Sequence, residues 1–561
     1  MRFMMNKMTR LRPVTLCFPP HWYYAAVPAD LLYTGSFLRS HDIPVRAIDL
    51  SAGLLHHHLR SVPGFAALQK RETYLSASAY ATAGQQVDDA LLAVSLRYGC
   101  EYGFPALRFP SVDIEHVPTA LQVGLSLSRN PALPILQRAI STLVKDDPVY
   151  IAVALVHPDQ LPQTLVLGRL LRAAGYRGFL CMYGAHEDVL SPEDLLDDLV
   201  PAPGQPLHHF FADFDGAIIG EAETALWALH TALSAGQSLD GVPSLLAPKH
   251  GVVALRSRGR ESLRALPGPD FSLVDGTLYP YPEPLVDVRM SRGCPWNRCT
   301  FCAITMHQEG YRALPVAEVS QALIAAHKQL GASFFRFRDD LLTPKQLLQL
   351  SLVASQLPFA IRFSVRSRFE PDLTADVLAA AHAAGLEEIW LGLESAVPRV
   401  RTLMKKGVDQ PVVERILKDA SQIGIRVRAL CLLGYPGETA DETRATIDFL
   451  DEHQHELASC ALTPFLLMRR SPIGADPQSF GVTVTPDVRP RHERLRPSLA
   501  ATWPGALGRA FLESLLDEAS RRLGPHFLTM TSGPSLAHAM IHASVLRRGW
   551  PKSARMLSVV P

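Results

Sequence analysis

The sequence predicts an α/β protein with two domains, each built on a parallel β-sheet, followed by a mostly helical C-terminal tail. Two alternating patterns support this fold class. Apolar strands alternate with amphipathic helices in residues 13–60 and again in residues 148–236, which is typical of an open, doubly wound, Rossmann-like sheet covered on both faces. A second alternation of strands and crossover helices runs through residues 284–475 and indicates a partial (β/α)6 barrel.

These patterns divide the chain into four regions. Residues 1–242 form the doubly wound domain, which contains a helical insert near residues 60–145. Residues 243–283 are rich in proline and glycine and are expected to be a linker. Residues 284–475 form the barrel, and residues 476–561 form a mostly helical region that could cap its open side.

The first domain is expected to open with a strand, a helix and a strand, and to continue with strand-helix pairs after the insert. Pro28 fits the first turn of the opening helix. In a sheet of this kind, ligands bind beyond the carboxyl ends of the strands. The expected strands, all apolar in character, are residues 13–18, 45–51, 148–156, 178–184 and 214–220.

The barrel region contains six expected strands, with clear helix starts between them. Thr343 precedes Pro344 at one helix start, and Thr439 with Glu442 forms a capping box at another. Barrels of this kind carry their working groups on the loops that follow the strands. The expected strands are residues 285–290, 333–340, 360–367, 388–395, 426–434 and 462–468.

Composition and charge limit the kinds of partner that the chain is expected to bind. Its 561 residues are 47% hydrophobic and 19% charged, and the formal net charge is +1 with the basic residues dispersed. This charge distribution favours neither nucleic acid nor an anionic membrane as a partner. The longest apolar stretch, residues 149–156, is too short to span a bilayer, and the N-terminal segment is a poor signal peptide. We expect a cytoplasmic protein that acts on a small molecule or a peptide.

The cysteines are distributed unevenly. Cys294, Cys299 and Cys302 lie within nine positions, in the spacing C-x4-C-x2-C, on the loop after the first barrel strand. Clustered thiols in a reducing compartment indicate a metal or redox centre. Three thiolates leave one corner of a four-iron cluster open to a cofactor or substrate, whereas with His307 as a fourth ligand the same thiols would suit zinc. The other cysteines stand singly: Cys17, Cys100, Cys181, Cys431 and Cys460.

Residues 285–475 resemble the core of a radical S-adenosylmethionine (SAM) enzyme. The resemblance rests on the cysteine loop, with Phe301 just before its third cysteine, and on four further motifs. These are "FRFRDD" ending the second strand, "WLGLES" on the fourth strand, "MKKG" after it, and "LLGYPGET" after the fifth. Most of the family has the spacing C-x3-C-x2-C, so this chain carries one extra residue between Cys294 and Cys299.

The resemblance implies roles for the matching residues. The three cysteines would hold a [4Fe-4S] cluster whose open iron chelates SAM. Phe301 would lie near the adenine, and Asp340, next to Asp339, would contact the methionine moiety or the substrate. Glu394 would accept hydrogen bonds from the ribose hydroxyls, and Arg366 would pair with the methionine carboxylate. The ordinary alternatives are a turn residue for Asp340 and a solvated strand end for Arg366.

Residues 1–242 resemble the cobalamin-binding-type domain that precedes the radical core in one large class of these enzymes. A loop at Gly184 and "GEAE" at residues 220–223 stand where the class has Gly-Gly and Gly-Glu-Gly-Glu. The resemblance therefore implies that Gly184 and Glu221 bind the cofactor. No D-x-H-x-x-G run, which would supply a histidine to cobalt, is present. The alternative is a doubly wound domain that has kept its shape without a corrin.

For the reaction, the resemblance implies a cobalamin-dependent methyltransferase that acts on an unactivated carbon of a natural-product or peptide substrate. The methyl group would pass from SAM to cobalt and then to a substrate radical. An electron donor such as a flavodoxin or a ferredoxin is implied as a partner. The alternatives are a cobalamin-free radical SAM enzyme that catalyses a rearrangement or a cyclisation, and a non-catalytic iron-sulfur binding protein.

Overall fold

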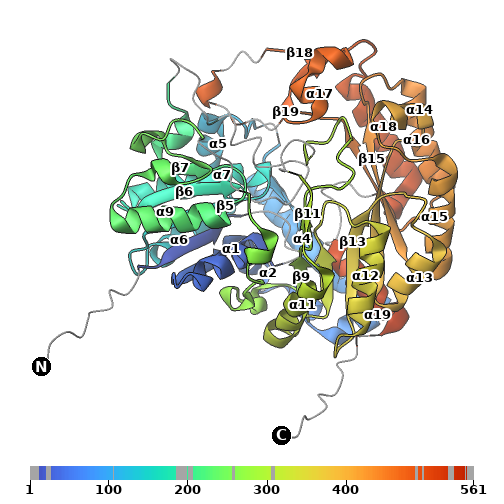
Figure 1. Ribbon diagram of the computed structural model, residues 1–561, viewed down its shortest axis with the longest axis horizontal. Helices are drawn as coiled ribbons and strands as arrows, with labels where there is room; N and C mark the ends of the chain where they lie inside the picture. Colours follow the sequence, from blue (N-terminus) through green and yellow to red (C-terminus); the bar gives the residue numbers. More distant parts are fainter. Residues whose placement is uncertain are drawn as a thin grey trace, which may run out of the picture.

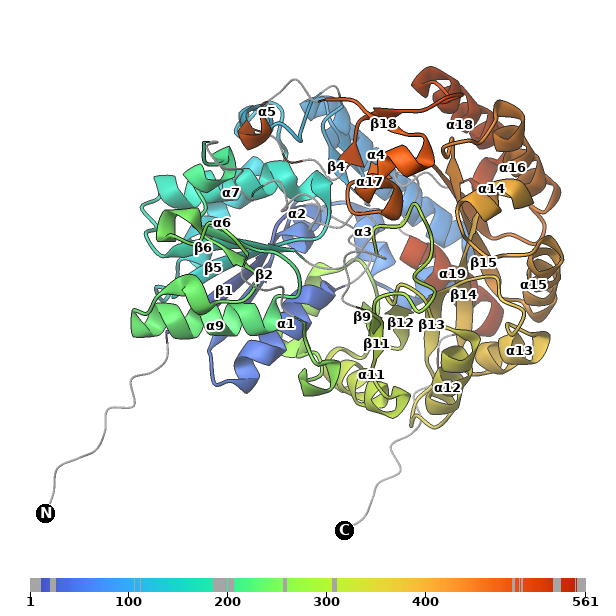
Figure 2. The same ribbon diagram turned by 45° about the horizontal axis from the view of Figure 1, so that its top comes forward.

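Two six-stranded sheets organise the chain and lie side by side in the computed structural model (Figures 1 and 2). The first belongs to the N-terminal half and the second to the C-terminal half. The structure describes residues 12–20, 27–104, 106–110, 112–184, 199, 206–255, 260–304, 310–486, 490–493, 495, 498–527, 536–549 and 551.

The first sheet has the order β2-β1-β5-β6-β7-β8, with every neighbouring pair parallel except β7 and β8. Its order reverses between β1 and β5, because the chain leaves β1 toward β2 on one side and returns to β5 on the other. Ligands bind at such a switch point in doubly wound folds. The strands are β1 (Val14–Phe18), β2 (Val45–Asp49), β5 (Tyr150–Leu155), β6 (Phe179–Gly184), β7 (Gly216–Ile218) and β8 (Leu245–Leu246).

Helices cover both faces of this sheet. Leucines of α1 (Ala29–Ser40) and α9 (Glu223–Ala235) pack on one face. Leucines of α6 (Leu133–Leu143) and α7 (Leu161–Ala173) pack on the other. Strands β1, β5 and β6 are therefore buried along their whole length, which explains why they are apolar at successive positions rather than alternating.

Between β2 and β5 the chain is mostly helical, as expected of the insert. The longest helix, α4, ends at Gly99, whose φ of 61° is the left-handed conformation that favours glycine. The insert packs against the C-terminal helix α19 (Leu536–Arg548), where Tyr80 stacks on His542 with ring centroids 3.9 Å apart. Its elements are α2 (Leu50–Leu59), α3 (Pro63–Leu68), η1 (Arg71–Leu75), α4 (Ala77–Tyr98), β3 (Glu101–Tyr102), β4 (Leu107–Arg108) and α5 (Val117–Gly124).

All six expected barrel strands are present, in one parallel sheet of order β16-β15-β14-β13-β12-β9. Because β9 and β16 are at opposite edges, the sheet is an open half-barrel. The capping boxes at Thr343 and Thr439 are both formed. The strands are β9 (Leu285–Val288), β12 (Phe334–Phe337), β13 (Arg362–Ser367), β14 (Leu386–Glu394), β15 (Arg426–Leu433) and β16 (Ser459–Pro464). The helices between them are α11 (Val316–Leu330), α12 (Pro344–Ser355), α13 (Ala375–Ala383), α14 (Pro398–Leu403), α15 (Gln410–Ile423) and α16 (Ala440–Glu452).

Each open edge of the half-barrel is contacted by a distant part of the chain. Val27, just before α1, forms a bridge with Val286 of β9. Phe527, after α18 (Arg509–Leu523), forms a bridge with Cys460 of β16, so the tail covers that edge. Unpaired edge strands invite pairing with other chains, and these bridges restrict access to both edges.

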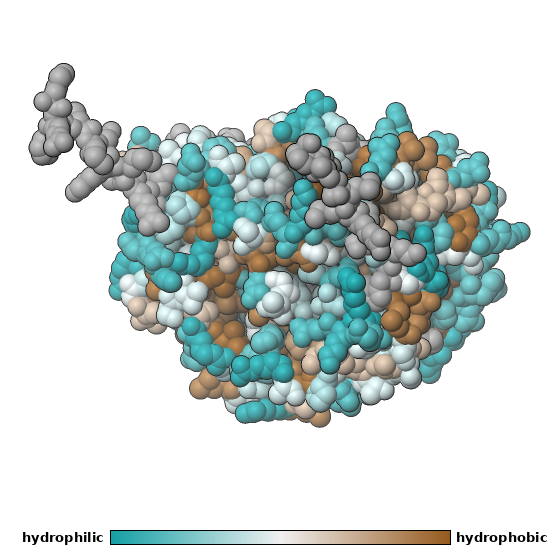
Figure 3. Space-filling view, turned by 90° about the horizontal axis from the view of Figure 1, so that it is seen from below, coloured by the Kyte–Doolittle hydropathy of each residue, from teal (hydrophilic) through white to brown (hydrophobic). Residues whose placement is uncertain are grey.

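The stretch expected to be a linker contributes to the first sheet. Strand β8 lies within it and pairs antiparallel with β7, and a tight turn follows where Ala247 bridges Val252. Among the described residues, no helix is both long and apolar enough to cross a bilayer. On the face shown in Figure 3, hydrophilic residues make up most of the rim and hydrophobic residues gather in separate groups.

Candidate active site

The cysteine loop begins immediately after β9, at the carboxyl edge of the half-barrel. A two-stranded ribbon closes its base, because β10 (Ser291–Arg292) pairs antiparallel with β11 (Arg312–Ala313). Cys294, Cys299 and Cys302 all lie within the loop that this ribbon encloses. His307, the alternative fourth ligand for zinc, lies outside the described residues.

The three thiols are close enough to influence one another. Cys299 is buried, whereas Cys294 and Cys302 are partly exposed, and no disulfide joins any of the described cysteines. Burial raises the pKa of Cys302, and the charges of Cys299 and Cys294 raise it further. Burial likewise raises the pKa of Cys299. Three neighbouring thiols on one loop are a donor set for an iron-sulfur cluster with one open iron, and bound iron would reverse these shifts by favouring the thiolates.

The "MKKG" segment forms one wall of the cysteine loop. The indole Nε1 of Trp296 donates to the carbonyl of Lys405 at 3.1 Å, and the backbone N–H of Thr300 donates to the carbonyl of Met404 at 3.1 Å. The guanidinium of Arg368 lies 3.6 Å from the centroid of the Trp296 ring. This segment therefore holds the backbone that carries the cysteines.

Glu394 ends β14 beside the cysteine loop and has a buried ion-pair partner. The Nζ of Lys406 donates to Glu394 Oε1 at 2.7 Å. Burial alone would lower the pKa of Lys406, but Glu394 and the charge of Cys299 together outweigh it and raise the lysine pKa. Both charges also act on the Cys299 thiol. The structure thus brings Glu394 to the cysteine loop, with one carboxylate oxygen engaged by Lys406.

The two aspartates after β12 differ in environment. Asp339 is fully buried and accepts hydrogen bonds from the Met290 N–H at 3.0 Å and from the Ser291 hydroxyl, so it supports the backbone at the start of the loop. Burial raises the pKa of Asp339 to about 7, although these hydrogen bonds oppose the shift. Asp340 is partly exposed and its charge acts on the Cys302 thiol. Asp340 therefore lies at the site, and Asp339 lies behind it.

Arg366 lies within the half-barrel against an aromatic ring of the neighbouring strand. Its guanidinium is 5.4 Å from the centroid of Trp390, its register partner on β14, and Arg428 lies 4.5 Å from the same ring. Cation–π contacts of this kind orient a guanidinium.

Phe301 packs against a small apolar cluster that includes Met404 and Tyr435. The contacts of Phe301 and Arg366 with SAM stay predictions.

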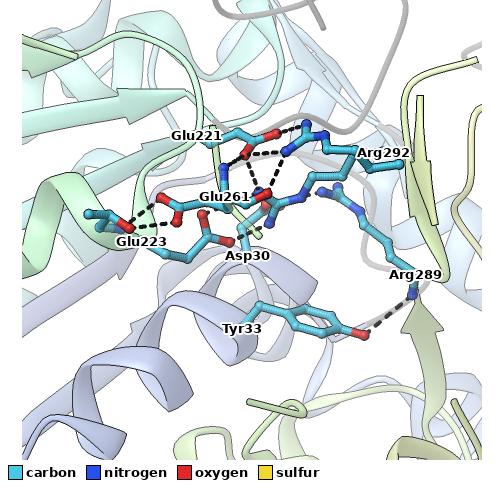
Figure 4. A network of polar contacts seen from close by, with 9 residues as sticks. Asp30, Tyr33, Glu221, Glu223, Glu261, Arg289 and Arg292 are labelled. Carbon is cyan, nitrogen blue, oxygen red and sulfur yellow. Dashed lines mark hydrogen bonds and ion pairs between the residues drawn. The ribbon is translucent and has the colours of Figure 1, made fainter. Parts of the chain in front are cut away.

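A buried ion-pair network joins the cysteine loop to the first domain (Figure 4). Arg292, two residues before Cys294, binds Glu223 through both terminal nitrogens, and its Nη1 also lies 3.1 Å from Glu221 Oε2. Arg312, opposite Arg292 in the ribbon, donates to Glu221 Oε2 at 3.0 Å and also to Glu221 Oε1. Both carboxylate oxygens of Glu221 are therefore engaged by the base of the cysteine loop.

The electrostatics of this network favour the charged forms of Arg292 and Glu221. Burial opposes the charge of Arg292, yet Glu223 and then Glu221 raise the pKa of its guanidinium. Burial alone would raise the pKa of Glu221, but Arg312 and Arg292 outweigh it and the pKa is lowered. Burial and the charge of Glu223 raise the pKa of Glu261, whose N–H donates to Glu221.

The predicted corrin-binding residues lie at the carboxyl edge of the first sheet, at the ends of the neighbouring strands β6 and β7. Gly184 is the last residue of β6 and pairs with Leu155 of β5, whereas Glu221 follows β7. The contacts of Glu221 account for its charge without a ligand, and its role in cofactor binding stays a prediction. At the switch point, Gln160 Nε2 donates to the carbonyl of Pro19 at 2.8 Å and links the loops after β5 and β1.

The carboxyl edges of the two sheets meet at the network. Glu221 and Glu223 follow β7, whereas Arg292 follows β9 of the half-barrel. A second contact comes from α1, where the hydroxyl of Tyr33 accepts from the Arg289 N–H at 3.3 Å, and Asp30 lies 3.8 Å from Arg289 Nη1 (Figure 4). Since both folds bind ligands at their carboxyl edges, the two candidate ligand sites face each other.

Sequence reasoning missed the residues that join these sites. Arg292 lies two residues before the first cysteine of the motif, and Lys406 lies inside "MKKG". Neither residue was assigned a role. A charged residue two positions before the first cysteine and two glutamates in "GEAE" were the available signals. Nothing in local periodicity pairs residues about 70 positions apart, such as Arg292 and Glu223.

Comparison with known proteins identifies the barrel. Residues 288–450 match the Radical SAM superfamily. "Uncharacterized methyltransferase PH0819" of Pyrococcus horikoshii is 28% identical over 258 residues, which cover 45% of this chain and 56% of that protein. "Ribosomal protein uS12 methylthiotransferase RimO" of Chlorobium chlorochromatii is 24% identical over 201 residues, covering 34% and 45% respectively. The chain thus spans about half the length of the curated relatives that it matches.

Solved structures match almost the whole chain. The radical SAM methyltransferase TsrM from Kitasatospora setae, with cobalamin and a [4Fe-4S] cluster bound, aligns with a TM-score of 0.59 at 15% identity and covers 91% of this chain and 88% of that one. The cobalamin-dependent SAM radical enzyme OxsB, with aqua-cobalamin and SAM bound, aligns with a TM-score of 0.58 at 13% identity, covering 91% and 67%.

The half-barrel with the cysteine loop is therefore a radical SAM domain. The chain as a whole has the fold of the radical SAM proteins that carry an N-terminal cobalamin-binding-type domain. This confirms both the predicted fold class and the predicted family resemblance. The boundaries of the four regions and the roles of the individual site residues stay predictions.

Proposed function

We propose that this chain is a cobalamin-dependent radical SAM C-methyltransferase. When bound, a [4Fe-4S] cluster supplies reductive cleavage of SAM to a 5′-deoxyadenosyl radical, and a corrin supplies a methyl carrier. Cys294, Cys299 and Cys302 would hold the cluster, since they are three thiols that influence one another's charge on a loop at the carboxyl edge of the barrel.

The residues around the cysteine loop would position SAM. Glu394 keeps one carboxylate oxygen beyond its bond to Lys406, and this oxygen can accept from a ribose hydroxyl. Asp340 lies near Cys302. Phe301, the residue before Cys302, offers an aromatic face. Arg366, oriented by Trp390, would pair with the SAM carboxylate. Together these side chains would hold the cofactor at the open iron and keep water away from it.

The single observation that carries this proposal is the contact between the carboxyl edges of the two sheets. Glu221 and Glu223, which follow β7, bind Arg292 at the base of the cysteine loop. A corrin at the switch point beyond β1 and β5 would therefore face the open iron, with the substrate between them. An enzyme that passes a methyl group from one cofactor to a radical made by the other requires this arrangement.

The partners remain part of the proposal. We propose a small-molecule or peptide substrate with an unactivated carbon, and Gly184 and Glu221 as part of the corrin site. Reduction of the cluster would come from a flavodoxin or a ferredoxin. Clustered thiols that ligate iron require a reducing compartment, which supports a cytoplasmic location.

The absorption spectrum tests the corrin half of the proposal. Full-length protein produced with cobalamin supplied, purified without oxygen and then stripped of its cluster, is expected to keep the visible absorption of about one corrin per chain. A colourless protein that still bound about four irons per chain before stripping would instead favour the cobalamin-free alternative, a rearrangement or cyclisation. A protein that bound the cluster but never cleaved SAM would favour the non-catalytic alternative.

A further inference from the structure

A cluster of nitrogen and oxygen ligands lies at the outer side of the first domain, away from the cysteine loop. His209 begins η3 (His209–Ala212), and His492 and Glu493 end η10 (Arg491–Glu493). One ligand atom of each residue lies within 4.8 Å of the ligand atoms of the other two. We propose that these side chains bind a divalent transition-metal ion of the zinc class.

The geometry fits a tetrahedral ion after a small adjustment. Zinc binds histidine nitrogen and carboxylate oxygen at about 2.0–2.2 Å, which places neighbouring ligand atoms about 3.3 Å apart. His492 Nε2 lies 3.9 Å from Glu493 Oε1, and the rings of His209 and His492 have centroids 5.2 Å apart. His209 is exposed, so rotation of its side chain can close the site without moving the backbone. Two imidazoles and a carboxylate suit zinc better than magnesium or calcium, which prefer oxygen ligands alone.

Neighbouring groups support the ligands. His116 Nε2 lies 3.3 Å from Glu493 Oε2, the second oxygen of the carboxylate, and His116 Nδ1 lies 2.7 Å from the Thr119 hydroxyl. Ligating carboxylates are usually fixed by hydrogen bonds of this kind.

The site would fasten the C-terminal region to the first domain. Figures 1 and 2 show η10, a short orange-red helix, beside α5 on the left of the molecule and far from α18. Leu495 is fully buried in the core of the first domain, and its N–H donates to the carbonyl of Glu115 at 2.7 Å. An ion bound by His209 and by His492 with Glu493 would cross-link segments about 280 positions apart in the sequence.

Metal analysis of the reconstituted full-length protein tests this inference. With the cysteines occupied by iron and after exposure to zinc and desalting, wild-type protein is expected to carry about one zinc per chain besides its iron. His209→Ala and His492→Ala should lose the zinc and keep the iron, whereas His455→Ala, at a side chain that is 72% exposed, should keep both. Zinc should raise the thermal unfolding midpoint of wild-type protein but not that of His209→Ala.

A cysteine variant of the same chain tests this inference independently of the proposed function. In the variant with alanine at Cys294, Cys299 and Cys302, the zinc should remain, because its ligands are not thiols. Loss of zinc from that variant with retention in His209→Ala would show that zinc occupies the cysteine loop, and would overturn the inference. So would the absence of zinc from wild-type protein. Neither result depends on whether the chain binds a corrin.

Discussion

Arg292 and Arg312 lie directly opposite each other in the β10–β11 ribbon, and both guanidiniums bind Glu221 of the first domain. The ribbon closes the base of the cysteine loop, so one carboxylate of the N-terminal domain fixes both ends of that loop. The same contact holds the carboxyl edges of the two sheets together. An ion-pair network therefore joins the two edges at which the cofactors are proposed to bind.

Substitution Glu221→Gln is expected to destabilise the protein, because it leaves two buried guanidiniums without full compensation. Removing one partner of a buried ion pair costs on the order of 3–5 kcal/mol. The matched control is Glu442→Gln, which breaks a more exposed pair with Arg399, where the side chains are 53% and 18% exposed, and should cost about 0–1 kcal/mol. Thermal unfolding midpoints check this prediction. Equal midpoints for the two variants would show that the network is not stabilising.

Substitution Gly407→Ala is expected to disturb the cysteine loop. A Cβ at this position would collide with the ring of Trp296, and the φ of 62° adds backbone strain. Gly481→Ala is the matched control, since Gly481 has a φ of 67° but nothing within 4 Å of its Cβ position. Iron content after reconstitution should fall in Gly407→Ala and stay unchanged in Gly481→Ala. Full iron content in both variants would contradict the proposed packing of the loop.

Glu394→Gln is expected to weaken SAM binding. The change removes a charged acceptor and leaves Lys406 buried without its partner. Loss of a charged hydrogen bond costs about 1.5–3 kcal/mol, which corresponds to roughly a 10- to 150-fold increase in the dissociation constant. Equilibrium dialysis of labelled SAM with the reconstituted protein measures this constant, and Glu414→Gln on the exposed side of α15 serves as the control. An unchanged constant in Glu394→Gln would exclude Glu394 from the SAM site.

Asp339 is expected to make stability depend on pH. Burial raises its pKa from 3.8 to about 7, so the folded state binds a proton that the unfolded state has released above about pH 4. The contribution of the protonated carboxyl is therefore fully present below about pH 4 and is lost as the pH rises through about 7, by on the order of 4 kcal/mol in total.

The variant Asp339→Asn isolates this effect. As the pH rises from 5 to 8, the thermal midpoint of wild-type protein should fall relative to that of Asp339→Asn. Glu438, whose pKa burial also raises to about 7, is present in both proteins and cancels in the difference. The control Asp441→Asn removes a fully exposed carboxyl and should show no trend. A flat difference for Asp339→Asn would contradict the shifted pKa.

The fold could be predicted because it depends on local periodicity. Apolar strands such as residues 150–155 and the capping box at Thr439 leave a signal within a few residues. The three cysteines were equally visible, since their spacing is local. Contacts between distant side chains were not predictable. The pairing of Arg366 with Trp390 depends on the register of neighbouring strands, and that of Lys406 with Glu394 depends on how the segment after α14 folds back onto the end of β14.

The role of "GEAE" shows the same limit. The motif was recognised and Glu221 was assigned to the corrin by its position after an apolar strand. Which way the carboxylate points depends on the neighbouring domain, and the structure directs it to Arg292 and Arg312. The sequence placed Glu221 after an apolar strand, where the structure has it, whereas only the packed structure shows what that edge of the sheet contacts.

Iron content of the cysteine variants tests the central claim most directly. Anaerobically reconstituted wild-type protein should hold about four irons per chain. The variant with alanine at Cys294, Cys299 and Cys302 should hold none, while Cys100→Ala, at a single buried thiol, should keep the wild-type content. Iron retained by the triple variant, or iron lost equally in Cys100→Ala, would contradict a cluster held by these three thiols and the radical chemistry derived from it.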